Sequence, residues 1–399
     1  MMKKIIIIIA MIAVAAGCKK PYNPPAIAAP ASYLVVEGVI NNGTDATVIK
    51  LSRTIPLSSK TKPQPELGAE VSVENERNES IILSDNLNNG QYSAGVLQLD
   101  NTLKYRLKIR TTSGQLYQSD FVPIKNTPDI DSIVYKVQNN GVQLWVNAHD
   151  PQNNTRYYRW EFDETYKYRS LFQSNWKYEG GQPVFRITYL HPEDNIYECY
   201  KTELSHQILL GSSAKLAQDV ISMQPIDFVE AGSGKISYGY SVLLRQYALT
   251  ADAFTYWQVL KKNTESLGSI FDAQPSSLAG NIHNTTNASE PVIGYVSVGS
   301  VKSKRIFIDK FNLDLFVPSY ISPPTTEDCP VGSISIYPAE SFSYRLEQTF
   351  GTGDTVLVNS VQPRESPIII GYTYAARQCA DCRFKTPFGT NVKPDYWPY

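Results

Sequence analysis

The chain has 399 residues, of which 42% are hydrophobic and 19% are charged. This composition is typical of a folded globular protein, and the length predicts roughly two or three domains. Lys and Arg number 37 against 38 Asp and Glu, so the formal net charge is −1. Without a basic excess there is no general attraction for phosphate backbones, so we do not expect a nucleic-acid partner.

Residues 1–17 have the layout of a bacterial secretory signal peptide: two lysines, an apolar run from Ile5 to Val14, and then small residues. A helix of that run would span about 15 Å, roughly half of a bilayer core, so a permanent membrane-spanning helix is not expected. Cys18 follows Gly17 directly, which indicates a lipobox in which the thiol is acylated and becomes the mature N-terminus. An ordinary signal peptide with an incidental cysteine is the alternative.

An acylated Cys18 would hold the mature protein on its membrane, because several acyl chains together give stable anchoring. The segment 18–31 is rich in Pro and Ala, which is typical of an extended tether and not of a packed element.

Residues 32–126 predict a small immunoglobulin- or transthyretin-like β-sandwich. The runs "YLVVEGVIN", "ATVIKLSRT" and "GAEVSVEN" are short, rich in β-branched residues and separated by turn signals. In "LKYRLKIRT" the apolar side chains alternate with Lys and Arg, which indicates a half-buried antiparallel strand.

Residues 127–399 predict a larger β-rich, sandwich-like domain with one α-helix and long loops, so the fold class is mainly β. "SIVYKVQ", "NNG" and "VQLWVNAHDP" read as strand, turn and strand, and "TRYYRWEFDETYKY" and "GKISYGYSVLLRQYALT" as long strands. The helix is expected after the capping residue Thr250, with Phe254, Trp257 and Leu260 on one stripe and Gly268 at its end.

Four cysteines remain besides Cys18: Cys199, Cys329, Cys379 and Cys382. An even number outside the cytoplasm predicts two disulfides, although the sequence does not choose among the three possible pairings. Cys379 and Cys382 form a CxxC, but a redox pair needs a strand-to-helix setting and a zinc ribbon needs a second CxxC. We therefore expect structural disulfides that pin the loop-rich C-terminal tail to the second domain.

Aromatic residues are abundant, with 26 Tyr, and many cluster in the middle of the chain. Exposed rings can stack on sugars or anchor a protein interface. The candidates for such a role are Trp160, Tyr166, Trp176 and Tyr178. The competing interpretation is that they fill the core, since aromatic residues also favour strands.

Glu161 and Asp163 lie two residues apart and would share one face of a strand, where two carboxylates could perform acid–base chemistry. Solvated edge charges are the commoner explanation. No histidine pair has the HExxH spacing and no serine stands in GxSxG. We therefore expect no catalytic residues, metal or cofactor, and a protein that is not an enzyme.

The segments "YALTADAFTYWQVLKKNTESLGSIFDAQPSSLAGNIHN", "EPVIGYVSVGSVKSKRIFI" and "CADCRF…GTNVKPDYW", with the early "YLVVEGVI" and "IKLSRTIPL", resemble Bacteroidetes lipoproteins of domain-of-unknown-function family 4249. The resemblance implies a lipid-anchored outer-membrane protein whose gene neighbours a TonB-dependent receptor. It therefore suggests an accessory role in nutrient binding or uptake. An oligosaccharide or a peptide is the ligand that we expect for such a role.

Two alternatives stay open: a hydrolase of glycans or peptides outside the cell, and a structural envelope protein. The membrane face, periplasmic or cell-surface, is also open, since Lys19 and Lys20 stand where surface-exported relatives often carry acidic residues.

Overall fold

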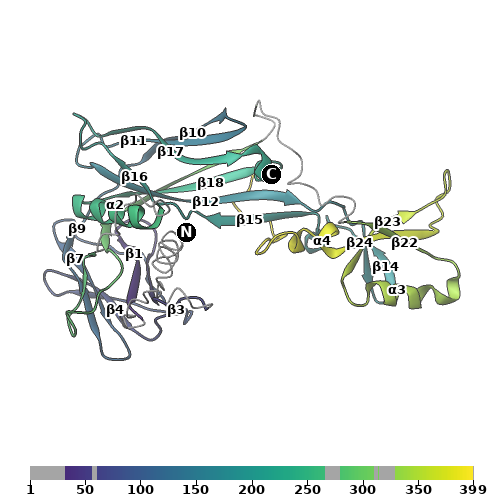
Figure 1. Cartoon of the computed structure of the whole chain (residues 1–399), viewed down its shortest axis with the longest axis horizontal. Helices are drawn as coiled ribbons and strands as arrows, with labels where there is room; N and C mark the ends of the chain where they lie inside the picture. The colour runs from purple at the N-terminus through teal and green to yellow at the C-terminus, as the bar shows by residue number, and fades with distance from the viewer. Residues whose placement is uncertain (1–31, 56–60, 266–278, 310–312, 314–328, 399) are drawn as a thin grey trace, which may run out of the picture.

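The computed structural model describes residues 32–55, 61–265, 279–309, 313 and 329–398 (Figure 1). The predicted signal peptide, the tether with Cys18 and the predicted helix end at Gly268 lie outside these residues. The described residues are mainly β, in several sheets, which confirms the predicted fold class. None of the described helices is long and apolar enough to cross a membrane.

The first sandwich packs two sheets face to face around one core. One sheet contains β1 (Leu34–Asn41), β2 (Thr47–Arg53), β3 (Gln64–Pro65), β6 (Gln91–Ala94) and β20 (Ser297–Gly299). The other contains β4 (Glu70–Asn75), β5 (Ser80–Leu83), β7 (Lys104–Arg110), β8 (Leu116–Ser119), β9 (Val122–Pro123) and β19 (Ile282–Asn284).

The alternating pattern of β7 is confirmed, because Tyr105, Leu107 and Ile109 are buried while the residues between them are not. Both sheets also recruit a late strand: β20 pairs in parallel with β1, and β19 pairs with β8. The first sandwich is therefore completed by chain that follows the predicted helix, beyond the division at residue 126.

The second sandwich has a three-stranded sheet of β10 (Ile130–Gln138), β11 (Gly141–His149) and β17 (Val220–Glu230). It packs on a five-stranded sheet of β12 (Tyr157–Arg169), β15 (Glu198–Leu204), β16 (Leu209–Ser212), β18 (Tyr240–Ala248) and β21 (Val301–Ile308). The predicted turn between β10 and β11 is confirmed, with positive φ at Asn139 and Asn140, as the favoured hairpin turns require.

A third, smaller unit lies at the far end of the molecule from the first sandwich (Figure 1). It combines the hairpin of β13 (Trp176–Glu179) and β14 (Gln182–Phe185) with a sheet of β22 (Val331–Ser335), β24 (Gly371–Ala376) and β23 (Thr355–Val361). Helices α3 (Phe342–Phe350) and α4 (Arg377–Ala380) belong to it. Only α2 (Ala251–Glu265) was predicted, so the expectation of a single helix was incomplete.

Two crossing segments join the first sandwich to the second. Lys125 exchanges backbone hydrogen bonds with Val298 and Ser300, at 2.9 and 3.2 Å. The buried Thr127 hydroxyl donates to the carbonyl of Ser300 at 2.5 Å and accepts from the amide of Ala248 at 3.0 Å. The predicted linker around residue 126 is therefore a hydrogen-bonded junction, which fixes the two sandwiches against each other.

Candidate functional site

A cleft of about 470 Å³ lies between the first sandwich and the second. Its walls are the outer face of β1 and β2, the exposed face of β12 and β18, one side of α2, and residues 293–295. This volume is within the range of about 300–1,000 Å³ typical of small-molecule sites. We call it the Arg159 cleft, after the residue on its floor.

Strand alternation places the charged groups of the floor. Arg159, Glu161 and Asp163 share one face of β12, while the residues between them turn into the core. On the neighbouring strand β18, Tyr247 stands directly opposite Arg159 and Arg245 directly opposite Glu161. The floor is thus a set of cross-strand pairs on adjacent strands.

The Arg159 guanidinium lies over two aromatic rings, 4.4 Å from the centre of Tyr247 and 4.2 Å from that of Trp257. Its Nη1 donates to Glu161, whose other oxygen accepts a 2.8 Å hydrogen bond from the Tyr247 hydroxyl. Although Arg159 is only 8% exposed, its buried Nε has no hydrogen-bond acceptor. The stack holds a planar cation rigidly and leaves it incompletely hydrogen-bonded.

Arg245 is matched by Asp163, which receives hydrogen bonds from both of its terminal nitrogens. These hydrogen bonds raise the pKa of the Arg245 guanidinium against the effect of its burial. Each of the two arginines in the floor therefore has its own carboxylate, and the floor carries no excess charge.

Helix α2 supplies the aromatic side wall. Its first turn is capped as predicted, since the amide of Ala253 donates to the Thr250 hydroxyl at 3.2 Å. Tyr256 packs on Tyr295 with ring centres 5.3 Å apart. Burial raises the pKa of Tyr256 to about 12 and, with the neighbouring Glu161, raises that of Tyr247 further. Both hydroxyls therefore stay neutral at physiological pH.

The opposite wall is the outer face of β1 and β2, where Val35, Val39 and Val48 point away from the first core. Strand β1 is hydrogen-bonded along both edges. It pairs with β2 on one side, and on the other with residue 293 and β20. This wall therefore offers side chains, and no free strand edge, to the cleft.

The four predicted aromatic candidates do not line this cleft. Trp160 and Tyr166 are buried in the core of the second sandwich, and Trp160 donates its Nε1–H to Gln246 at 2.8 Å. Their proposed role at a binding surface is therefore corrected to core packing. Trp176 and Tyr178 are half-buried and cover the third unit, where they contact Tyr372 and Phe350.

The cleft residues that the sequence did not indicate are Arg159, Arg245, Tyr247, Trp257 and Tyr295. Trp257 was predicted to lie on the packed stripe of the helix, and it does so in part, because it is half-buried against the floor. The signal in the sequence was the alternation of charged and aromatic residues in "RWEFDE". It predicted correctly that Glu161 and Asp163 share a face, but their oxygens are engaged with arginines.

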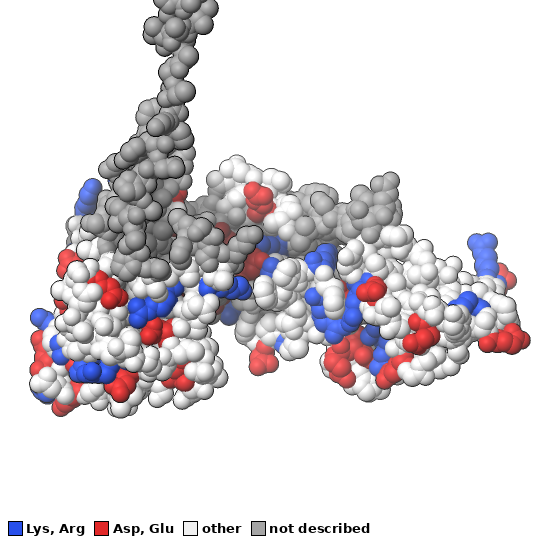
Figure 2. All heavy atoms as spheres, turned by 60° about the horizontal axis from the view of Figure 1, so that its bottom comes forward, with Lys and Arg blue, Asp and Glu red and all other residues white. Residues whose placement is uncertain are grey.

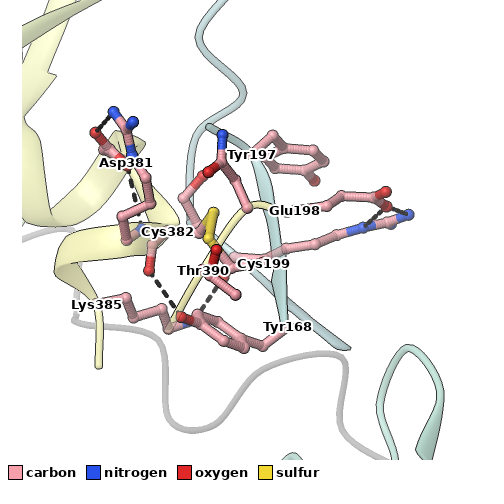
Figure 3. Close-up of a disulfide and its surroundings, with 12 residues drawn as sticks. Tyr168, Tyr197, Glu198, Cys199, Asp381, Cys382, Lys385 and Thr390 are labelled. Atoms are coloured by element: carbon pink, nitrogen blue, oxygen red, sulfur yellow. Dashed lines mark hydrogen bonds and ion pairs between the residues drawn. A yellow bond between two sulfur atoms is a disulfide. The ribbon is translucent and has the colours of Figure 1, made fainter. Parts of the chain in front are cut away.

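The predicted disulfides are present: Cys199 pairs with Cys382 and Cys329 with Cys379. Each CxxC cysteine therefore has a distant partner. Figure 3 shows the first bridge, where Tyr168 donates to the Cys382 carbonyl at 3.1 Å and Lys385 to the Arg169 carbonyl at 2.8 Å. The bridge fixes the C-terminal tail to β15, as expected from the sequence.

No group of three or more His, Cys, Asp or Glu side chains is arranged to hold a metal ion within the described ranges. Acidic and basic side chains are interspersed on the face drawn in Figure 2. This mixture gives that face no single sign of charge.

Among the solved structures that align with parts of the chain are two with a TM-score of 0.15. The chicken interferon gamma receptor alpha chain is 11% identical, and the alignment covers 55% of this chain and 91% of that one. A "putative carbohydrate binding protein" from Bacteroides uniformis is 8% identical, with 55% and 90% covered. At this TM-score neither alignment carries an argument about fold or ligand. No curated protein matches the chain.

A family model described as "Domain of unknown function (DUF4249)" matches residues 19–305. The match spans both sandwiches up to the first part of β21, and so includes every wall of the Arg159 cleft. The chain belongs to the DUF4249 family.

Proposed function

We propose that the protein is a non-catalytic, lipid-anchored protein of the outer membrane that assists a TonB-dependent receptor in nutrient binding or uptake. The observation that carries the proposal is the Arg159 cleft. Hydrogen bonds fix the junction between the two sandwiches that form the cleft. The charges on the cleft floor are balanced, and aromatic rings contact Arg159, which is nine-tenths buried. Preformed concave sites with few, well-placed polar groups are typical of ligand binding.

The sequence supports the location. The run that ends at Gly17-Cys18 has the form of a lipoprotein signal, and the Pro- and Ala-rich segment 18–31 would hold the folded body away from the bilayer. A hydrolase is the weaker proposal, because the only nominated carboxylates, Glu161 and Asp163, are held by arginines and a tyrosine.

The experiment is affinity purification of the tagged, full-length protein from detergent-solubilised membranes of a Bacteroidetes host. Mass spectrometry should identify a TonB-dependent receptor in the eluate. An unrelated lipoprotein with the same tag and similar abundance is the control. Recovery of no receptor, in detergent that preserves an established receptor–lipoprotein pair, would contradict the proposal.

A further inference from the structure

We propose that the Arg159 cleft binds a neutral saccharide, with the rings of its side wall against the sugar and Arg159 as a hydrogen-bond donor to it. The proposal rests on the proposed function only for its setting in nutrient uptake. Its evidence is the chemistry of the cleft itself.

The charged groups on the floor of the cleft are paired with one another. Arg159 is paired with Glu161 and Arg245 with Asp163, so the floor has neither a free cation for an anionic ligand nor a free carboxylate for a cationic one. The rim adds two exposed acidic residues of the first sandwich, Glu37, which pairs with Lys50 at 3.1 Å, and Asp45. An anion would meet the Asp45 carboxylate without an unmatched arginine to compensate, which disfavours anionic ligands.

The cleft offers both a hydrogen-bond donor and a hydrogen-bond acceptor to a ligand. Within the described residues, Nη1 of Arg159 donates to Glu161, while its Nε is buried without an acceptor and is not open to a ligand. Because Arg159 lines the cleft, its other terminal nitrogen, Nη2, is the donor that can meet a ligand. The exposed carboxylate of Asp45 on the rim is available as an acceptor. A sugar hydroxyl both donates and accepts, so a polyhydroxylated ligand can satisfy a donor and an acceptor of the cleft at once.

Aromatic and aliphatic side chains give the cleft an apolar surface as well. Trp257 and Tyr295 are half-buried and line the cleft, with Val39 and Val48 on the facing wall. The C–H faces of a sugar ring are apolar and pack on such side chains, while its hydroxyl edges remain available for the polar groups.

A peptide is the competing occupant. The usual way in which a β-protein binds an extended peptide is to add it as a strand to a sheet edge. Strand β1 has no free edge here, because β2 pairs with one side, and residue 293 and β20 with the other. The cleft is therefore better suited to a compact ligand recognised through its own hydroxyl groups.

The test uses the lipidated full chain in detergent on an array of neutral plant, host and microbial oligosaccharides, followed by titration calorimetry with the best binder. Trp257→Ala should weaken binding about tenfold or more, the loss that corresponds to about 1.4 kcal/mol. Trp257→Phe keeps an aromatic face and should retain much of the binding affinity that Trp257→Ala loses. Arg159→Lys keeps the charge but loses the planar donors and should also weaken binding.

Tyr344→Ala is the matched control, since Tyr344 is an exposed aromatic residue on α3, in the third unit. It should leave saccharide binding unchanged, and thermal unfolding should show that each variant is folded. Binding by no neutral saccharide, binding of short peptides alone, or unchanged affinity in a folded Trp257→Ala would overturn the proposal. Receptor recovery with Trp257→Ala separates the two proposals: retained recovery without saccharide binding would leave the accessory role intact.

Discussion

Gly294 stands where the wall of the Arg159 cleft passes closest to β1. Its φ of +144° is a conformation that side-chain-bearing residues rarely adopt, and a Cβ there would lie 2.3 Å from the Val36 carbonyl oxygen. Next to it, Ile293 exchanges backbone hydrogen bonds with Leu34 and Val36 at 2.9 and 2.8 Å. The absence of a side chain at this one residue therefore lets the cleft wall join the first sandwich.

We expect Gly294→Ala to lower the free energy of unfolding by about 1–3 kcal/mol, because it adds backbone strain and a backbone clash. Gly232→Ala is the control, since a Cβ at Gly232 meets no atom within 4 Å. Denaturant unfolding of the two variants measures the difference. Equal stability of both variants and the parent chain would mean that the wall is not held as described.

At the residue scale, the sequence predicted the face shared by Glu161 and Asp163 because strand alternation is a local property. It could not tell that Trp160 faces the core and Arg159 the cleft. That choice depends on what covers each face, and the cover comes from α2 and from β1, which are distant in sequence.

At the scale of elements, the junction between the sandwiches depends on two segments that lie side by side, 125–127 and 298–300. Thr127 is the residue that ties them to β18, through its hydroxyl group. Strands β19 and β20 then close the first sandwich from a point far along the chain. Their short runs gave no periodicity from which this pairing could be predicted, whereas the long runs of β7, β12 and β18 did.

Thr127→Val should destabilise the protein by about 1–3 kcal/mol, because it removes the hydroxyl and leaves the Ala248 amide and the Ser300 carbonyl without that partner. Thr127→Ser retains the hydroxyl and should therefore lose much less stability than Thr127→Val. Hydrogen exchange at β18 and β20 checks the location of the effect. Protection that is unchanged in Thr127→Val would contradict the account of the junction.

On the scale of the whole molecule, three β-rich bodies follow one another (Figure 1), and covalent bridges reinforce the last two. Cys199–Cys382 ties the C-terminal tail to the second sandwich, and Trp397 packs beyond it against Tyr200 and Phe307. Cys329–Cys379 lies in the third unit. The sequence predicted two bridges, but their pairing depends on a fold that brings residues 199 and 382 together.

Replacing Cys199 and Cys382 by Ser should lower the free energy of unfolding by about 2–5 kcal/mol, as expected for the loss of a native disulfide that closes a long loop. Hydrogen exchange should rise in β15 and in the tail that follows residue 382. The matched variant without Cys329 and Cys379 should instead increase exchange around β23 and β24. The same exchange pattern in both variants would contradict the separate roles assigned to the two bridges.

The third unit was the least predictable part of the chain. Helix α3 is short, and the hairpin of β13 and β14 joins a sheet formed more than a hundred residues later. Its aromatic residues, including Trp176 and Tyr178, pack against that sheet and against α3. Such packing is a long-range property that local sequence patterns do not specify.

We propose that acyl chains on Cys18 hold the protein on the outer membrane, where it would work with a TonB-dependent receptor. Mass spectrometry of the N-terminal peptide of the protein purified from membranes tests this claim most directly. We predict a peptide that begins at Cys18 and carries acyl chains. A mature N-terminus with an unmodified thiol, or a protein recovered mainly from the culture medium, would contradict the account.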